Sequence, residues 1–264
     1  MIDRLAADSG IPSDILESDF KVVHQRHGTS EYAFSIEELT CLRNKHPDQD
    51  VTNLYAAAID VYRESRRQVL RLYPTVESSL QKLNSYGCLL VAYTESMEFY
   101  TKYRIKKLGL DLLLDYLYSP PDHRLPDGLS PEQIRFYSAE HYRLVHTKQE
   151  YTPRGELKPN PHILTEIINA VGAKREETVY VGDSLMKDII MAKEASVVDV
   201  WAKYGLVQNQ PAYELLRRVT HWPVSSVERE KILTDANVKP SFVLKRVFGE
   251  ILELFDFVKF NGRP

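Results

Sequence analysis

Two acidic residues that follow a short apolar run are the strongest chemical feature of the sequence. The run Val179-Tyr180-Val181 ends at Gly182, and Asp183 and Asp188 follow, five positions apart, where a helical pattern begins. Because α/β folds place their chemistry at the carboxyl ends of parallel strands, both carboxylates can face that edge. Such a pair suits a hard cation, Mg2+, held against a phosphate. The alternative is an ordinary acidic cap of a helix.

Two further polar residues stand at boundaries of the same kind. Thr94 follows the apolar run 88–93, so its hydroxyl and the N–H groups behind it, beginning with Glu95, can bind an anion. Lys158 lies among prolines that stiffen the main chain just before a helical pattern. An ammonium held in this way can neutralise a phosphate or a carboxylate. Taken singly, a plain helix cap and a solvated lysine are the alternatives.

Strands and helices that would position these residues alternate after Pro74. Apolar runs at 88–93, 178–181 and 197–201 predict buried strands. The pattern of residues 112–118 also indicates a strand. Helical patterns at 96–108, 161–171 and 185–195 separate or follow them. This alternation predicts βαβ units, and therefore an α/β fold: a Rossmann-like parallel sheet with helices on both faces.

Changes in pattern predict three regions. Residues 1–72 carry only helical periodicity and predict a small helical cap, whereas 73–210 predict the α/β core. The core contains an insert at 119–157, rich in proline, tyrosine and histidine, which we expect to pack or to line the substrate entrance. Residues 211–264 predict a C-terminal helical extension that includes a helix over 242–257. Its aromatic residues favour packing onto the core, and a docking segment or a homodimer contact is the alternative (Phe255, Phe257 and Phe260).

Charge and composition exclude some classes of partner. The 34 basic and 37 acidic residues give a formal net charge of −3, which favours neither nucleic acid nor a membrane surface. No apolar run approaches the ~20 residues of a membrane span, and the N-terminus lacks a signal-peptide pattern. Cys41 and Cys88 are far apart and predict free thiols in a reducing compartment. A soluble cytoplasmic protein is the expectation.

The order and spacing of the three polar sites resemble the haloacid dehalogenase (HAD) superfamily. A strand ending in Thr94, the run Lys158-Pro-Asn-Pro and the segment Gly182-Asp-Ser-x-x-x-Asp188 are similar to that family's motifs two, three and four. The likeness covers about residues 5–206. It implies a Rossmann-like core that carries a mobile cap, and residues 1–72 match a small cap.

The resemblance also implies an activity, a Mg2+-dependent phosphatase acting on a small phosphorylated metabolite. Thr94, with Glu95 beside it, would hold the transferring phosphoryl group, and Lys158 would balance its charge. Asp183 would bind Mg2+ directly, and Asp188 would assist or hold Lys158. Phosphoryl transfer depends mainly on positioning and charge neutralisation, which these groups supply. The identity of the substrate cannot be read from the sequence.

The family's first motif, a strand ending in Asp-x-Asp, has no counterpart in these residues. Its first aspartate is the nucleophile that forms an aspartyl-phosphate, and its second is the general acid and base. The early pair Asp48 and Asp50 has the spacing but follows a proline rather than an apolar strand. The missing strand would be central, between the strands that carry Thr94 and Asp183. Two explanations stay open: a phosphatase shortened at its N-terminus, which we favour, and a chain that lost the nucleophile and works by binding or regulation.

Overall fold

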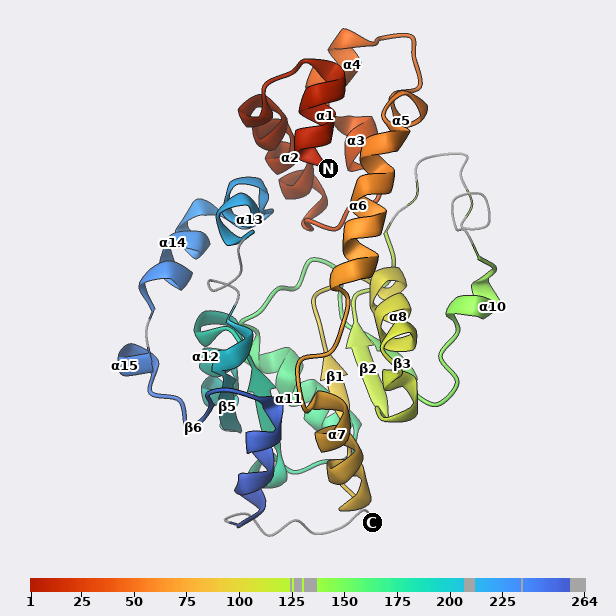
Figure 1. Cartoon of the computed structure of the whole chain (residues 1–264). Helices are drawn as coiled ribbons and strands as arrows, with labels where there is room; N and C mark the ends of the chain where they lie inside the picture. Colours follow the sequence, from red (N-terminus) through yellow and green to blue (C-terminus); the bar gives the residue numbers. More distant parts are fainter. Residues whose placement is uncertain (124, 126–129, 131–136, 207–211, 234, 257–264) are drawn as a thin grey trace. The chain divides into compact units, whose positions relative to one another are not determined.

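Helices form the first part of the chain, and strands alternate with helices after it (Figure 1). The computed structural model describes residues 1–264 except 124, 126–129, 131–136, 207–211, 234 and 257–264. Within it, Met1–Arg71 and Gln208–Glu228 form one compact unit, and Leu72–Val207 and Arg229–Pro264 form another. None of the described helices is both long and apolar enough to cross a membrane.

The first unit is helical because its apolar residues recur at helical spacing. Its helices are α1 (Ile2–Ser9), α2 (Ser13–His27), α3 (Ser35–Glu38), α4 (Thr40–Lys45), α5 (Val51–Leu54), α6 (Ala56–Val69) and α13 (Tyr213–Val219). Gly10 and Gly28 end α1 and α2 in the left-handed conformation that glycine adopts without strain. Buried side chains of α1, α2 and α4 form the core of this unit (Leu5, Leu16, Phe20, Val23 and Leu42).

A segment from late in the sequence belongs to this first unit. Arg218, in α13, pairs with both carboxylate oxygens of Glu17, in α2, at 2.5 and 3.1 Å. His24 donates from Nδ1 to the carbonyl oxygen of Val219 at 2.6 Å. The stretch expected as one C-terminal extension, 211–264, is therefore divided between the two units.

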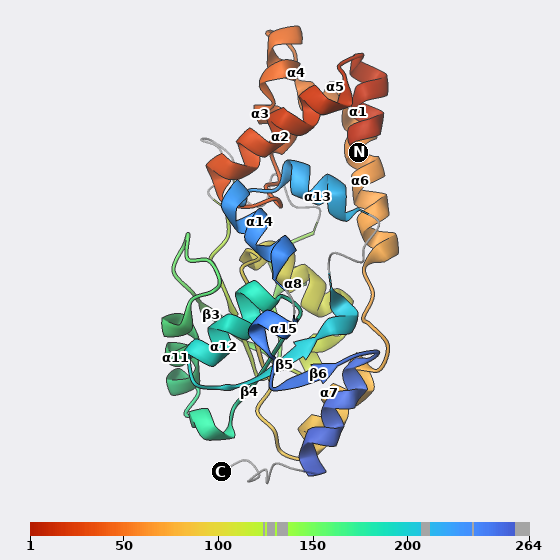
Figure 2. The same cartoon turned by 90° about the vertical axis from the view of Figure 1, so that its left-hand side faces the viewer.

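Parallel strands form two sheets in the second unit (Figure 2). One sheet has the order β1 (Val91–Tyr93), β2 (Tyr116–Ser119), β3 (Lys148–Tyr151). The other has the order β4 (Val179–Gly182), β5 (Val198–Ala202), β6 (Phe242–Leu244). All the pairings between these strands are parallel. Across the described residues, β1 and β4 are therefore edge strands that each pair with a single neighbour.

Helices cover both faces of these sheets, which confirms the predicted α/β class. α11 (Pro161–Ala170) and α12 (Ile190–Glu194) pack together over Tyr93 and Tyr180. On the other face, α7 (Val76–Ser85) and the 3-10 segment η6 (Phe248–Asp256) pack against Val200 and Leu244. The remaining elements of the second half are α8 (Glu98–Lys107), η1 (Leu110–Leu112), α10 (Ala139–Tyr142), η2 (Arg175–Glu177), the π turn η3 (Leu185–Ile189), η4 (Lys203–Gly205), α14 (Val224–Ile232) and α15 (Asp235–Val238).

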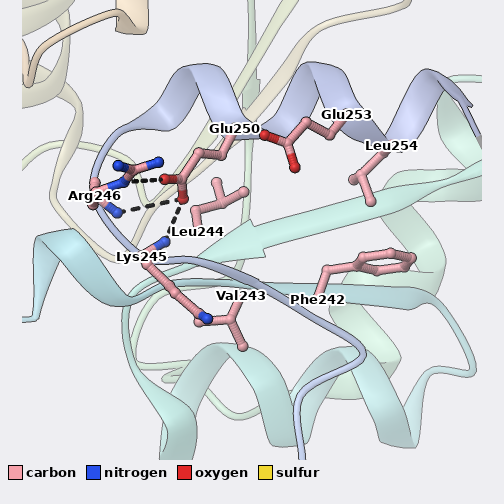
Figure 3. Close-up of a pocket in the computed structure, with 8 residues that line it drawn as sticks. All are labelled: Phe242, Val243, Leu244, Lys245, Arg246, Glu250, Glu253 and Leu254. Atoms are coloured by element: carbon pink, nitrogen blue, oxygen red, sulfur yellow. Dashed lines mark hydrogen bonds and ion pairs between the residues drawn. The ribbon is translucent and has the colours of Figure 1, made fainter.

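The C-terminal region departs from the predicted helix over 242–257. Phe242–Leu244 forms a strand, and only Phe248–Asp256 is helical. Glu250 accepts the N–H groups of Lys245 and Arg246 at 2.5 and 3.3 Å, which fixes the turn that joins β6 to η6 beside a pocket of about 540 Å³ (Figure 3). Phe257 and Phe260 lie outside the described residues.

Candidate functional site

Thr94 directly follows β1 and closes a small turn. Its N–H donates to the carbonyl oxygen of Tyr118 at 3.0 Å, which continues the pairing with β2. Its hydroxyl oxygen accepts the N–H of Ser96 at 3.0 Å. The N-cap of α8 is Met97, so Thr94 is not the cap of that helix. The hydroxyl is thus placed at the carboxyl end of a parallel strand, where an anion can meet it.

Lys158 is largely buried, with 11% of its side chain exposed. Its ammonium lies 3.1 Å from Asp188 Oδ1 and 3.3 Å from the carbonyl oxygen of Tyr93, at the end of β1. The rings of Tyr93 and Tyr180 flank the ammonium, with centroids 4.6 and 5.5 Å from Nζ. Asn160, not Lys158, caps α11 by accepting the N–H of Ile163. A solvated lysine at a helix start is therefore excluded.

Asp188 has all the partners expected of an orienting carboxylate. Besides the Lys158 ammonium, it accepts the Tyr180 hydroxyl at 3.1 Å and the Ser184 N–H at 3.1 Å. The turn η3 presses it against the end of β4, where an added Cβ at Gly182 would overlap its side chain. Glycine at 182 is required by this close approach.

Asp183 lies at the same strand end, and its environment suits a cation. Burial, and then the negative charge of Asp188, raise the pKa of the Asp183 carboxyl, while the Lys158 and Lys187 ammonium groups oppose the rise. Trp201 fixes the main chain here by donating to the Asp183 carbonyl oxygen at 2.9 Å. A divalent cation beside Asp183 would relieve the repulsion between the two carboxylates.

The donor set fits Mg2+ better than a cation that needs a full protein cage. Within the described residues there is no cluster of three or more His, Cys, Asp or Glu side chains that could hold a metal. Mg2+ usually keeps several waters and binds through one or two carboxylates together with substrate phosphates. Because Asp188 already has three partners, Asp183 is the carboxylate better placed to meet the ion.

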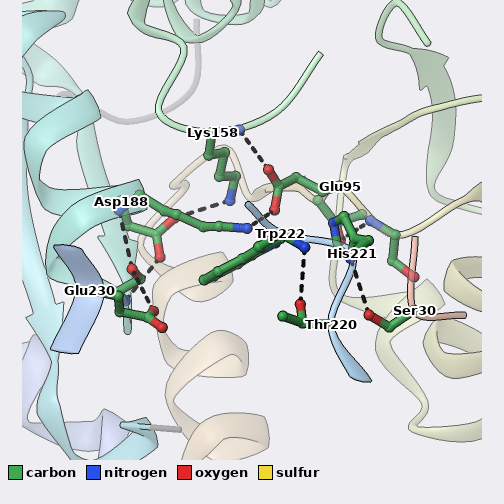
Figure 4. Close-up of polar contacts among 12 residues, drawn as sticks. Ser30, Glu95, Lys158, Asp188, Thr220, His221, Trp222 and Glu230 are labelled. Atoms are coloured by element: carbon green, nitrogen blue, oxygen red, sulfur yellow. Dashed lines mark hydrogen bonds and ion pairs between the residues drawn. The ribbon is translucent and has the colours of Figure 1, made fainter. Parts of the chain in front are cut away.

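The site also contains two charged residues that sequence reasoning did not select, Lys187 and Glu230. The Lys187 ammonium pairs with the Glu95 carboxylate, whose Oε1 also accepts the Lys158 N–H at 2.6 Å (Figure 4). Glu230, from α14, meets the Ser184 hydroxyl at 3.4 Å. Lys187 stands inside the acidic motif, so its position was a signal. Glu230 lies 46 residues from Ser184, and nothing local in the sequence marks it.

A family model described as haloacid dehalogenase-like hydrolase matches residues 3–196. The match covers most of the chain, which therefore belongs to the haloacid dehalogenase-like hydrolases. This confirms the resemblance drawn from the three motifs.

Curated relatives share part of the chain. A glyceraldehyde 3-phosphate phosphatase of Methanopyrus kandleri is 30% identical over 156 residues, which cover 59% of this chain and 54% of the relative. A second protein of that name, from Pyrococcus furiosus, is 43% identical over 51 residues, 19% of this chain and 21% of the relative. The chain thus spans about half the length, or less, of these curated relatives.

A solved structure resembles the chain over most of its length. A predicted phosphoglycolate phosphatase from Haemophilus somnus matches with a TM-score of 0.50 and 17% identity, covering 96% of this chain and 88% of that one. At this identity the match supports the fold alone.

Proposed function

We propose that these residues form part of the active site of a Mg2+-dependent phosphatase, which hydrolyses a small phosphate monoester through an aspartyl-phosphate. The observation that carries the proposal is the placement of the Lys158 ammonium, 3.1 Å from Asp188, with Asp183 and Thr94 at the ends of β4 and β1. The two curated relatives named as phosphatases of a small phosphorylated metabolite support this substrate class.

Each side chain has a role in this proposal. Asp183, assisted through Asp188, would hold Mg2+, which supplies positive charge to the phosphoryl oxygens. The Thr94 hydroxyl would hold one phosphoryl oxygen, and Lys158 would neutralise the charge that collects on the transferring group. Asp188 keeps the Lys158 ammonium in place. Stabilising charge in a site that excludes water is the main task in phosphoryl transfer.

The attacking aspartate is proposed to come from a strand outside these 264 residues. The main-chain groups of Leu90 and Thr94 form hydrogen bonds with β2. Because successive residues of a strand direct their main-chain groups to opposite sides, those of Val91 and Tyr93 point away from β2, to the open side of β1. Tyr93 of β1 and Tyr180 of β4 pack against one core cluster. A strand that paired with both β1 and β4 would carry its last residues to Lys158 and Asp183.

The test is hydrolysis of an aryl phosphate in the presence of Mg2+. We expect no turnover from residues 1–264, and turnover from the same chain extended at its N-terminus by an apolar strand ending in Asp-x-Asp. The control is the extension with its first aspartate changed to asparagine, which should be inactive. Turnover by residues 1–264 alone would contradict the proposal. An upstream reading frame that encodes such a strand would support it, and a nearby stop codon would count against it.

A second candidate is a non-catalytic member of the family that binds a phosphorylated ligand or a protein. The absence of an Asp-x-Asp strand from the sequence favours it. Calorimetric titration with inorganic phosphate and Mg2+ separates the two: binding without turnover, in both the chain and its extended form, favours the binding protein. A homodimer remains a prediction.

A further inference from the structure

Four charged residues from three separate segments form a closed ring of contacts in the second unit. Glu95 follows β1, Lys158 precedes α11, and Lys187 and Asp188 lie together in η3. Glu95 accepts the main-chain N–H of Lys158 at 2.6 Å and pairs with the Lys187 ammonium. Asp188 closes the ring by accepting the Lys158 ammonium at 3.1 Å (Figure 4).

The ring holds Lys158 at both ends. Asp188 fixes the ammonium, whereas Glu95 fixes the main chain from which the side chain departs. Glu95 is itself held by Lys187, whose N–H donates to the Ser184 hydroxyl oxygen at 3.1 Å. The two contacts of Lys158 therefore lead back to the same turn, η3.

The side chains of the Glu95–Lys187 ion pair are mostly shielded from solvent. The two side chains are 19% and 11% exposed. Burial lowers the pKa of the Lys187 ammonium, and the Glu95 carboxylate opposes that shift. Replacement of a buried ion pair by apolar residues is often neutral or stabilising. Because one carboxylate oxygen of Glu95 pairs with Lys187 and the other accepts the Lys158 main-chain N–H, the pair points to a role in geometry.

We propose that Glu95 and Lys187 are positioning residues that hold the Lys158 main chain so that its ammonium meets the phosphoryl group. This inference rests on the proposed function, because the phosphoryl group is the ligand that Lys158 would meet. It assigns the Glu95 carboxylate to positioning rather than to contact with phosphate. Lys187 acts through Glu95 and touches no reacting atom.

The first measurement is hydrogen exchange of the Lys158 amide, which reports on the clamp without any ligand. In Lys187→Gln, Glu95 loses its ammonium partner, and we expect the Lys158 amide to exchange at least about tenfold faster. The matched control is Lys102→Gln, because Lys102 pairs with Glu98 at similar exposure, 21% and 20%. The control should change the exchange of Lys158 less than about twofold. Equal exchange of Lys158 in the two variants would overturn the clamp.

The second measurement is calorimetric binding of inorganic phosphate in the presence of Mg2+. Outer partners that orient metal ligands typically contribute about 10–100-fold in affinity. By analogy, Glu95→Gln and Lys187→Gln should each weaken phosphate binding about tenfold. Lys187→Arg, which keeps the charge, should recover most of the loss. The double variant should bind phosphate no more weakly than either single variant, because both substitutions break the same ion pair between Glu95 and Lys187.

The outcomes separate this inference from the proposed function. If the N-terminally extended chain does not hydrolyse an aryl phosphate but Lys187→Gln frees the Lys158 amide, the clamp holds and the proposed function fails. If the extended chain hydrolyses the aryl phosphate and both variants leave phosphate affinity and amide exchange unchanged, the proposed function holds and the clamp is wrong.

Discussion

At the scale of single residues, Asp188 approaches the end of β4 so closely that residue 182 must be glycine. An added Cβ would overlap the Asp188 side chain, which is held on its other sides by Lys158 and Tyr180. We expect Gly182→Ala to lower the free energy of unfolding by about 1–3 kcal/mol, as overpacking of a filled site does. Because Asp188 must move away from Lys158, phosphate binding should fall as well. Urea unfolding and calorimetry measure the two effects.

Gly172 offers a control for this substitution. It has a φ of 70°, and nothing lies within 4 Å of an added Cβ. Gly172→Ala should therefore lose about 1–2 kcal/mol of stability through backbone strain alone and leave phosphate binding unchanged. If both variants reduced phosphate binding equally, the loss would reflect general destabilisation and not the movement of Asp188.

Local sequence could predict the residues of the site that stand at the ends of elements. Thr94 and Asp183 each follow an apolar run, and the structure brings Lys158 to Asp188. Their roles in catalysis stay predictions. The contact between Lys187 and Glu95 could not be predicted, because these residues are 92 positions apart and neither type marks a site alone.

At the scale of elements, β6 shows how a short strand depends on distant polar contacts. Asp199, 1% exposed in β5, accepts the N–H and the hydroxyl of Ser241 at 2.8 and 2.6 Å, just before β6 begins. Its third partner is the exposed Lys193, at 3.0 Å. The run Phe242-Val243-Leu244 is too short to show a period, so the helical pattern after it dominated the prediction of a helix over 242–257. β3 escaped prediction because its residues are mostly polar and exposed.

We expect Asp199→Asn to lower the free energy of unfolding by about 1–3 kcal/mol. The amide keeps the shape of the carboxylate but loses its negative charge and replaces one acceptor oxygen by an NH2 group, which weakens the charge-assisted bonds to Ser241 and Lys193. Amide exchange in β5 and β6 should increase with it. Lys193→Gln is the control: it removes only the more exposed ion pair, worth about 0–1 kcal/mol. Equal losses in the two variants would show that Asp199 acts through its charge on Lys193 and not by docking β6.

At the scale of the whole molecule, each compact unit is assembled from segments that are far apart in the chain. The strand β6 completes the sheet of β4 and β5. α13, with residues 224–228 of α14, completes a helical unit whose other helices precede residue 72. Periodicity could predict both classes of element. It could not predict their pairing, because the contacts that join α13 to α2 are single side chains about 200 positions apart, such as Arg218 with Glu17.

His24 makes this long-range assembly sensitive to pH. Burial lowers the pKa of its imidazole from 6.5, an effect that the nearby His27 increases and the hydrogen bond to Val219 opposes. A histidine with a lowered folded-state pKa contributes stability that is complete above its unfolded pKa. That stability is lost as the pH falls from 6.5 towards the folded pKa, because only the unfolded chain then takes up the proton. The slope for one proton is at most about 1.4 kcal/mol per pH unit.

Urea unfolding at pH 7.5 and 5.5 tests this expectation in a chain labelled with 5-fluorotryptophan. Of the two tryptophans, Trp222 reports on the first unit and Trp201 on the second. The transition seen by Trp222 should shift to lower urea at the acidic pH. In His24→Asn, which keeps a donor for the Val219 carbonyl but does not titrate, that shift should shrink. The Trp201 transition serves as the internal control, since His24→Asn should leave its own pH dependence unchanged. An undiminished shift at Trp222 in the variant would assign the pH dependence to other groups, because His24 would then bind protons equally in the folded and unfolded chain.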